Sequence, residues 1–260
     1  MAKVIAIINQ KGGVGKTTTA VNLSALLGAM GQRVLMIDLD PQGNTTSGLG
    51  MEVDDKSIYE VIMGRMKLTD VMEETEFKDL SIAGSDVRLA NAELELVEVE
   101  KREYRLKTAV QSVQQDFDFI FIDCPPSLGL LTINALGAAD SVLIPIQCEY
   151  YALEGVASLM NTISRVKKTI NPHLEIEGVL LTMLDGRTNL GLQVVDEVKK
   201  HFKKQVYATV IPRSVRLGEA PSHGEPIHVY DKRSAGCVAY VNLAKEVLKR
   251  NNIKVKEFKL

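Results

Sequence analysis

The chain has 260 residues, of which 45% are hydrophobic, so it can bury a sizeable core in one large α/β domain or in two small ones. We expect one domain over residues 1–250 and a short C-terminal tail over 251–260. Without an apolar run of membrane-spanning length or a signal-peptide pattern, the sequence predicts a cytoplasmic protein with no stable membrane association. The three cysteines lack Cys-x-x-Cys spacing, which argues against a disulfide framework or a zinc site and favours small buried side chains.

The net charge of −2 is unevenly distributed along the chain. Residues 1–186 carry 16 Lys and Arg against 26 Asp and Glu, whereas residues 187–260 carry 15 against 7. This asymmetry indicates a polyanion-binding surface towards the C-terminal end of the fold. Solvated helix faces rich in lysine would give the same count, so the charge alone leaves both interpretations open.

The first predicted elements are a buried strand over residues 4–8 and an amphipathic helix from Thr17 to Met30. Between them lies a glycine-rich loop, and the order strand, loop, helix is typical of a phosphate-binding site. Glycine tolerates the dihedral angles that turn backbone N–H groups towards phosphate oxygens, and the helix directs its partial positive N-terminus at the same anion. The loop residues expected to contact a nucleotide are Lys11, Gly12, Gly13, Val14, Gly15, Lys16, Thr17 and Thr18.

Two side chains of this loop have defined chemical roles. Lys16 is expected to neutralise charge on the β- and γ-phosphates, and the Thr17 hydroxyl to ligate a magnesium ion that bridges them. The usual first glycine of such a loop is replaced by Gln10, and a second lysine, Lys11, precedes Gly12. The pattern therefore departs from the ordinary phosphate-binding loop.

Acidic residues follow two further predicted strands. The strand over 34–37 is followed by Asp38 and Asp40, and the apolar run over 117–122 is followed by Asp123. Because parallel strands bring their carboxyl ends to one edge of a sheet, we expect these carboxylates at the ligand crevice, with Asp123 beside the magnesium ion. Two prolines then end the last of these strands, so the chain leaves the sheet as a loop near the γ-phosphate.

The other predicted elements alternate between helix and strand, which predicts an α/β fold with a single-domain, doubly wound, mostly parallel sheet flanked by helices. The expected helices are a short one that Ser57 caps and that runs to Gly64, a long charged one over 90–115, and others over 152–170, 193–204 and 235–250. The expected strands are 80–83, 142–146, 178–183 and 206–211, with a turn over 212–216 and a loop over 219–226.

The string Lys-Gly-Gly-Val-Gly-Lys-Thr resembles the deviant phosphate-binding loop (deviant Walker A) of the ParA/MinD family of ATPases. Four more segments strengthen the resemblance, which extends from about Lys3 to about Arg250 and is nearest to the chromosomal ParA (Soj) branch. These segments are Asp38–Asn44, Asp123–Ser127, Gln147–Gly155 and Arg213–Gly224.

The resemblance implies an ATPase of weak intrinsic activity that uses ATP and Mg²⁺ and acts in chromosome or plasmid partitioning. Such proteins form a homodimer in the ATP state, with two nucleotides sandwiched face to face. The dimer binds double-stranded DNA without sequence preference, which implies association with the nucleoid. A ParB/Spo0J-type centromere-binding protein stimulates ATP hydrolysis, and hydrolysis releases the DNA.

Within this resemblance, the expected catalytic residues are Lys11, Lys16 and Asp40. Lys11 lies at the front of its loop and can reach the phosphates of a second subunit, although it could instead serve its own nucleotide. Asp40 is the candidate for orienting the attacking water, and with Asp123 it is expected to contact the metal through water. Asp38 is expected to be a magnesium-shell or structural residue.

The resemblance also implies a DNA-binding surface and a base pocket. Arg187 and Arg216 match basic loop positions of the family, and clustered cations suffice to bind a phosphate backbone without reading bases. Lys199 and Lys200 extend the predicted patch. The nucleobase is expected near Met183 and Pro212, although a structural role fits those two residues equally well.

Two alternative functions remain open. A MinD-like membrane-associated ATPase that positions division sites would need a C-terminal amphipathic helix. The tail over 251–260 is short, alternates instead of following the helical period, and is expected to be frayed. A metabolic enzyme, such as an ATP-driven amidase or a reductase iron protein, would need a substrate pocket or cluster cysteines, and the cysteine spacing offers no ligand pair.

Overall fold

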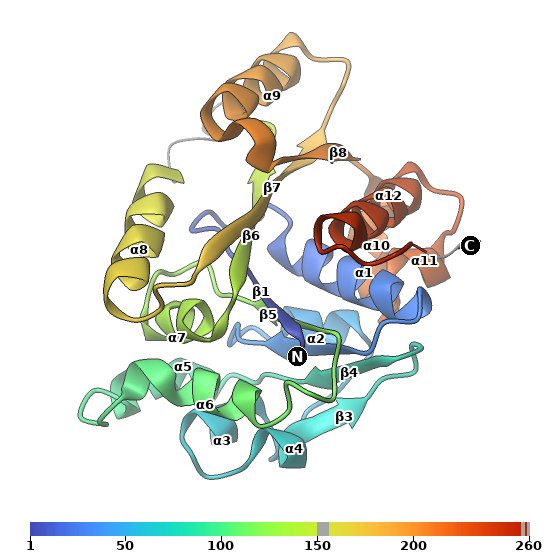
Figure 1. Ribbon diagram of the computed structural model, residues 1–260. Helices are drawn as coiled ribbons and strands as arrows, with labels where there is room; N and C mark the ends of the chain where they lie inside the picture. Colours follow the sequence, from blue (N-terminus) through green and yellow to red (C-terminus); the bar gives the residue numbers. More distant parts are fainter. Residues whose placement is uncertain (150–155, 256–257, 259–260) are drawn as a thin grey trace.

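The computed structural model describes residues 1–149, 156–255 and 258, which form one sheet with helices on both faces (Figure 1). The strand order is β3-β4-β2-β5-β1-β6-β7-β8, and each neighbouring pair is parallel except β3 and β4. This confirms the predicted single-domain, doubly wound α/β fold. The strands are β1 (Lys3–Ile7), β2 (Val34–Asp38), β3 (Met72–Glu74), β4 (Leu80–Ala83), β5 (Phe119–Asp123), β6 (Ser141–Gln147), β7 (Glu175–Leu184) and β8 (Val206–Pro212).

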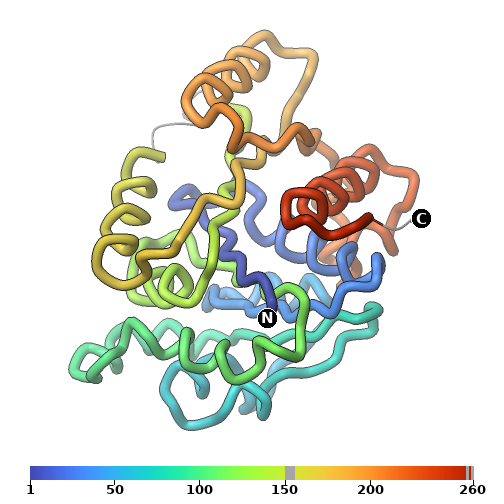
Figure 2. The backbone as a smooth tube through the Cα atoms, in the orientation of Figure 1, coloured from blue at the N-terminus to red at the C-terminus, as the bar shows by residue number. Residues whose placement is uncertain are grey.

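Helices connect most of the successive strands, and the course of the chain can be followed in Figure 2. The α-helices are α1 (Lys16–Ala29), α2 (Asn44–Gly48), α3 (Ile58–Ile62), α4 (Leu68–Val71), α5 (Leu89–Glu95), α6 (Arg105–Gln111), α7 (Leu130–Ala138), α8 (Val156–Thr169), α9 (Asn189–Phe202), α10 (Val215–Glu219), α11 (Ile227–Tyr230) and α12 (Ala235–Arg250). Short 3₁₀ helices are η1 (Arg102–Tyr104), η2 (Lys203–Gln205) and η3 (Ala220–His223).

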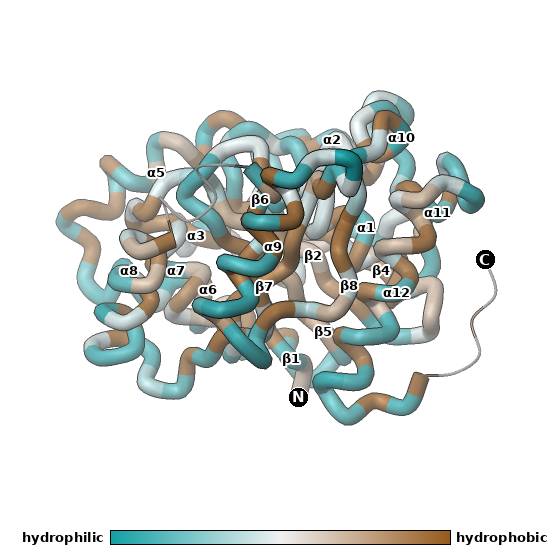
Figure 3. Tube along the Cα trace, turned by 90° about the horizontal axis from the view of Figure 1, so that it is seen from above, coloured by the Kyte–Doolittle hydropathy of each residue, from teal (hydrophilic) through white to brown (hydrophobic). Residues whose placement is uncertain are grey.

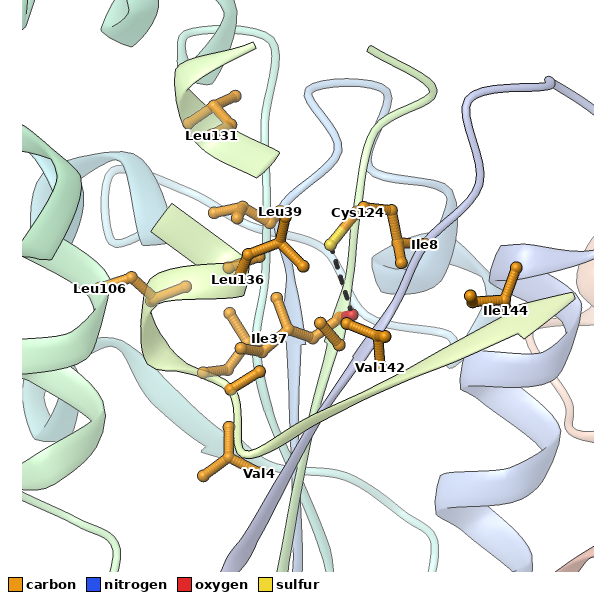
Figure 4. Close-up of a cluster of buried hydrophobic side chains, with 14 of the residues drawn as sticks. Val4, Ile8, Ile37, Leu39, Leu106, Cys124, Leu131, Leu136, Val142 and Ile144 are labelled. Atoms are coloured by element: carbon orange, nitrogen blue, oxygen red, sulfur yellow. Dashed lines mark hydrogen bonds between the residues drawn. The ribbon is translucent and has the colours of Figure 1, made fainter. Parts of the chain in front are cut away.

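The two faces of the sheet are buried in two hydrophobic cores. Because successive strand residues point to opposite faces, Val4 and Ala6 of β1 lie in the first core and Ile5 and Ile7 in the second. Helices α3 to α9 cover the first core, and α1, α10, α11 and α12 cover the second. Figure 4 shows Cys124 within the first core; all three cysteines are free and buried, as their spacing predicts. Hydrophobic segments accordingly follow the central strands in Figure 3.

The predicted long helix over 90–115 is wrong, because the structure divides this segment into α5, η1 and α6. Lys101, just before η1, adopts a left-handed φ of 55°, which a continuous right-handed helix cannot include. The side chain of Asn134 on α7 satisfies the backbone at the break. Its Oδ1 accepts a hydrogen bond from Leu106 N at 3.2 Å, and its Nδ2 donates to Arg102 O at 2.9 Å. The break therefore depends on a distant amide that local periodicity does not reveal.

Several predicted boundaries also move. Helix α9 begins at Asn189, four residues before the expected start, because the Thr188 hydroxyl accepts a hydrogen bond from Gly191 N at 3.3 Å and caps the helix. The expected turn over 212–216 and loop over 219–226 contain α10 and η3. Helix α8 is described from Val156, so the expected residues 152–155 lie outside the described part of the chain.

The C-terminal tail is not a frayed end over the residues that the structure describes. Ile253 N donates to Leu248 O at 2.9 Å beyond the end of α12, and Ile253, Val255 and Phe258 pack partly buried against the second core. Residues two apart share a side of an extended segment, so Ile253 and Val255 face the core together. Within the described ranges, none of the helices combines the length and the apolar character that a membrane span requires.

Candidate nucleotide site and basic surface

The phosphate-binding loop connects β1 to α1 at the carboxyl edge of the sheet. Gly13 and Gly15 have φ values of 72° and 90°, which residues with a Cβ rarely adopt. Gly15 is the N-cap of α1, and no described side chain caps this helix end. The first N–H groups of α1 are therefore available to an anion. Lys16 opens the helix, is only 7% exposed, and its positive charge acts on the nearby carboxyl of Asp123.

Three neighbouring strands hold the loop in this conformation. Asn9, two residues after the end of β1, donates from Nδ2 to Pro145 O of β6 at 2.7 Å, and its Oδ1 accepts from Lys11 N at 3.0 Å. The Thr182 hydroxyl of β7 donates to Val14 O at 2.8 Å. Asn9 and Thr182 are not among the predicted site residues, because their roles arise from contacts across the sheet. The loop is thus fixed before any ligand binds.

Two of the three predicted metal-binding side chains, those of Thr17 and Asp123, are in contact. Asp123 accepts hydrogen bonds through Oδ2 from the Thr17 hydroxyl at 2.9 Å and from the Thr45 hydroxyl of α2 at 2.7 Å. Its Oδ1 is buried and has no hydrogen-bond partner among the described residues. A buried, unsatisfied carboxylate oxygen beside a threonine hydroxyl suits the water shell of a magnesium ion that Thr17 ligates directly. The residues therefore fit Mg²⁺.

The electrostatics of Asp123 agree with this fit. Burial, with the nearby charge of Asp38, raises the pKa of Asp123 to about 7, while the hydroxyls of Thr45 and Thr17 and the Lys16 ammonium oppose the rise. A buried carboxylate without a cation is costly, so a bound divalent cation would favour its ionised form. The sequence could not identify Thr45, whose hydroxyl is 78 positions from its acceptor.

Asp38 and Asp40 have different surroundings, although they are two residues apart. Asp38 is fully buried at the end of β2, and its Oδ2 accepts from the backbone N–H and the hydroxyl of Thr46 at 2.9 and 2.7 Å. Burial raises the pKa of Asp38 to about 6. Asp40 is 9% exposed, and Gln42 N is the one donor to its carboxylate in the described part of the chain, at 3.0 Å. Asp38 anchors α2, whereas Asp40 keeps an oxygen available for water.

A cavity of about 190 Å³ lies beside Gly15, and both residues that were predicted to contact the nucleobase line it. Met183 adopts a left-handed φ of 52° there, and Pro212 ends β8. Tyr240, which the sequence does not single out, also lines the cavity, and its hydroxyl lies 3.1 Å from that of Thr19. The full lining is Gly15, Thr18, Thr182, Met183, Ile211, Pro212, Arg213, Ser214, Leu217, Gly218 and Tyr240.

The departures from the ordinary loop, Lys11 and Gly12, lie at its outer side. The Lys11 ammonium is 3.9 Å from Glu149 Oε2, and Arg213 contacts the other oxygen of Glu149 at 3.2 Å. Both members of the Lys11–Glu149 pair are partly exposed. A Cβ at Gly12 would meet no described atom within 4 Å, and Gly12 lacks a positive φ. Nothing in the described chain therefore requires glycine at this position.

The predicted basic residues fall into two places. Strands β7 and β8 end side by side, joined by the hydrogen bond from Arg213 N to Leu184 O at 3.1 Å, and Arg187 and Arg216 follow these ends. Lys199 and Lys200 lie in the last turn of α9, about 15 Å along the helix from its first residue, Asn189, at about 1.5 Å per residue. The two arginines thus lie near the carboxyl edge of the sheet, and the two lysines lie away from that edge, at the far end of α9.

Both arginines already have acidic neighbours. The Arg187 guanidinium forms two hydrogen bonds with Asp185, at 2.9 and 2.7 Å, and these lower the pKa of Asp185 to about 2. Arg216 lies 2.9 Å from Glu219 and 3.5 Å from Asp231. Arg187 is 88% exposed, so its outer face remains open to a ligand.

Comparison with known proteins agrees with the geometry. A family model described as "AAA domain" matches residues 2–176. Soj, the sporulation initiation inhibitor protein of Bacillus subtilis, is 59% identical over 95% of this chain and 98% of its own length. The chromosome partitioning protein ParA of Myxococcus xanthus is 51% identical over 98% of this chain and 90% of its own.

A solved structure extends the likeness to three dimensions. Cobyrinic acid a,c-diamide synthase from Mycobacterium smegmatis, with a bound ATP analogue and magnesium, superposes with a TM-score of 0.85 and 37% identity over the whole of both chains. Together with the deviant loop and the carboxylates behind it, these similarities show that the chain belongs to the ParA/Soj family of chromosome-partitioning ATPases, of the ParA/MinD type.

Proposed function

We propose that this chain is an ATP-dependent dimerisation switch for chromosome or plasmid partitioning. In the ATP state, two copies pair face to face and bind double-stranded DNA without sequence preference. Hydrolysis, stimulated by a ParB-type partner, returns the protein to a form that leaves the DNA and the nucleoid. The observation that carries the proposal is the outer side of the loop, where Lys11 is accessible and Gly12 has no role within the described chain.

Nucleotide binding is supported by the preformed loop. The free N–H groups of α1, the buried Lys16 and the cavity beside Gly15 provide places for phosphates and a base. Thr17 would hold Mg²⁺ directly, and Asp123 would hold it through water. Bound Mg²⁺ would neutralise charge on the phosphate oxygens during phosphoryl transfer.

The residues of this chain would supply positioning and charge for hydrolysis. Asp40 has a carboxylate oxygen free to orient a water molecule, and phosphoryl transfer needs orientation more than a strong base. Lys16 stabilises negative charge on the transferred phosphate from within its own subunit. Lys11 adds a second positive charge only when another copy of the chain presents it, so hydrolysis depends on pairing.

The Lys11–Glu149 ion pair does not prevent Lys11 from contacting the phosphates of a second subunit. A partly exposed ion pair at 3.9 Å contributes about 0.2–1 kcal/mol, which is small beside a contact with a polyphosphate. Lys11 can therefore leave Glu149 when a second subunit brings its phosphates within reach. Because Gly12 has no side chain, two such loops can approach closely.

DNA binding is supported by the arginines at the carboxyl edge. Arg187 and Arg216 follow adjacent strands, and a dimer would present two such pairs on one surface. Contacts of this kind go to phosphates and carry no sequence information. Lys199 and Lys200 would extend the surface only for DNA that also contacts the far end of α9.

The decisive experiment is sedimentation of the Asp40→Ala protein with ATP, with ADP and without nucleotide, each with and without DNA. We expect a dimer that retains DNA with ATP alone and hydrolyses ATP slowly. The matched control, Asp54→Ala, changes an exposed aspartate in a loop and should behave as wild type. DNA retention that is independent of nucleotide, or normal turnover by Asp40→Ala, would contradict the proposal.

The alternatives receive less support. A MinD-like protein needs a free amphipathic tail, whereas Ile253 and Val255 pack against the second core. An amide-forming activity like that named for the M. smegmatis protein would not require ATP-dependent retention on DNA. Sedimentation with anionic liposomes and with DNA separates these functions, because each predicts a different binding partner for the ATP form.

A further inference from the structure

The helical segment around α5 has two apolar stripes. Hydrogen bonds from Leu89 N to Asp86 O and from Ala90 N to Val87 O show that helical turns begin before α5 itself. One stripe is buried in the first core and consists of Leu89, Ala92 and Leu96. The other is solvent-exposed and consists of Val87, Leu94 and Val97, with exposed fractions of 76%, 77% and 57%.

The exposed stripe follows helical geometry. Leu94 is seven residues after Val87 and three before Val97, a spacing that places all three on one side of a helix. The helix lies beside α7 in Figure 1, and the turn that follows it projects at the left-hand edge of Figure 2. Three large apolar side chains exposed on one side of a single helical segment make this side a candidate interaction surface.

Acidic side chains outnumber basic ones around this stripe. From Val87 to Glu100 the chain carries four glutamates and one cation, Arg88, which is paired with Asp86 at 2.8 Å. Glu98 and Glu100 are exposed. Glu95 forms an ion pair with Arg65 at 3.4 Å and accepts a hydrogen bond from the Tyr59 hydroxyl at 3.0 Å. The cations that follow, Lys101 and Arg102, stand at one end of the stripe, and Arg102 bonds to Val97 O and Glu103. The stripe is therefore apolar with acidic flanks.

We propose that this surface, Val87 to Glu100, docks a basic amphipathic helix of a partner protein. Its apolar side chains would pack on Leu94 and its neighbours, and its flanking Lys and Arg would face the glutamates. DNA and anionic lipid surfaces are repelled by the same carboxylates. A second copy of the chain, related by a two-fold axis, would bring two acidic surfaces together, which like charges oppose.

One contact links this surface to α7, the helix that follows the loop after β5. Glu93, half-buried on α5, accepts a hydrogen bond through Oε1 from Leu131 N at 3.4 Å, in the first turn of α7. A Cβ at Gly129 would lie 2.1 Å from the same oxygen, so the two segments are in close contact. Helix α7 follows the loop that leaves β5 at Asp123. A docked helix is therefore positioned to alter ATP turnover, a consequence that rests on the proposed function.

The binding test uses the full chain without nucleotide or DNA, so that its outcome does not depend on the proposed function. The probe is a fluorescent peptide of about 18 residues, roughly five helical turns, with leucines along one face and lysines and arginines beside them. A control peptide has the same composition and charge, with its leucines distributed around the helix. We expect the phased peptide to bind at least about tenfold more tightly than the control.

Matched variants locate the binding. Leu94→Asp should weaken binding of the phased peptide at least about tenfold, and Glu98→Lys with Glu100→Lys should weaken it mostly at low salt. Controls on other surfaces are Val238→Asp, an exposed valine of α12, and Glu73→Lys with Glu74→Lys on β3. Equal affinity for both peptides, or unchanged affinity in Leu94→Asp, overturns the proposal. Self-association of wild type that Leu94→Asp abolishes would assign the stripe to a second copy, which also overturns it.

The coupling has a separate readout. With ATP, magnesium and DNA present, the phased peptide should change the ATP turnover of wild type. In Glu93→Gln the peptide should bind as before but change turnover less, because a neutral amide holds Leu131 N more weakly. The same change in turnover in both proteins would refute the link through Glu93 and leave the docking result standing.

Discussion

Replacing Thr45 with valine isolates one buried hydrogen bond at the metal-binding carboxylate. The Thr45 hydroxyl donates to Asp123 Oδ2 at 2.7 Å, and both residues are fully buried. Valine has nearly the same shape as threonine, so the change removes a donor without opening a cavity. Asp123 then retains one donor, Thr17, on Oδ2, and still none on Oδ1 within the described chain.

The expected loss follows from the charge of the acceptor. A hydrogen bond to an ionised group contributes about 1.5–3 kcal/mol, and one between neutral groups about 1 kcal/mol. Because the pKa of Asp123 is raised to about 7, this carboxyl is mostly ionised at pH 8 and mostly protonated at pH 5.5. We expect Thr45→Val to lower the free energy of unfolding by about 2 kcal/mol at pH 8 and by about 1 kcal/mol at pH 5.5.

The assay is urea denaturation of nucleotide-free protein in EDTA at both pH values. Thr45→Ser keeps a hydroxyl at the same place and serves as the matched control. A loss below about 0.5 kcal/mol for Thr45→Val at pH 8 would be within the range of ordinary surface changes and would refute the reasoning. Equal losses for valine and serine would also refute it, since the hydroxyl would then contribute nothing.

Three further outcomes test the site. Lys16→Ala should weaken ATP binding by about tenfold to a hundredfold, the equivalent of one charge-assisted contact, and unchanged affinity by calorimetry would dismiss the loop assignment. Arg187→Glu should leave ATP-dependent dimerisation intact but reduce DNA affinity and the salt slope by about 1, and normal retention on DNA would remove Arg187 from the surface. Burial raises the pKa of Asp38 to about 6 and of Asp123 to about 7, above their ordinary value of 3.8, so the folded state binds these protons more tightly than the unfolded state. The unfolding free energy of metal-free protein should therefore fall between about pH 4 and pH 7, and Asp123→Asn should flatten that decline in denaturation curves.

The sequence predicts the fold and the phosphate-binding loop because both depend on local patterns. Glycines at 13 and 15, a lysine and a threonine follow a buried strand, and the structure gives those glycines the positive φ values that the loop requires. The acidic ends of β2 and β5 are predictable for the same reason, since parallel strands share a carboxyl edge.

The contacts that complete the site are not local, and the sequence does not reveal them. Thr45 reaches Asp123 across 78 positions, and Thr182 reaches Val14 across 168. The break before α6 likewise depends on Asn134, which is 28 positions from Leu106. Periodicity describes which face of an element is apolar, but it does not tell which polar side chain on another element will satisfy a backbone group.

The position of β5 in the sheet has a consequence for how the protein is made. Strand β1 pairs with β5 and β6 and not with β2, which follows it in the chain. A ribosome that has released the first 115 residues has therefore produced the glycine loop but none of the strands that flank β1. Nascent chains should gain affinity for nucleotide only after β5 and β6 emerge, in the second half of synthesis.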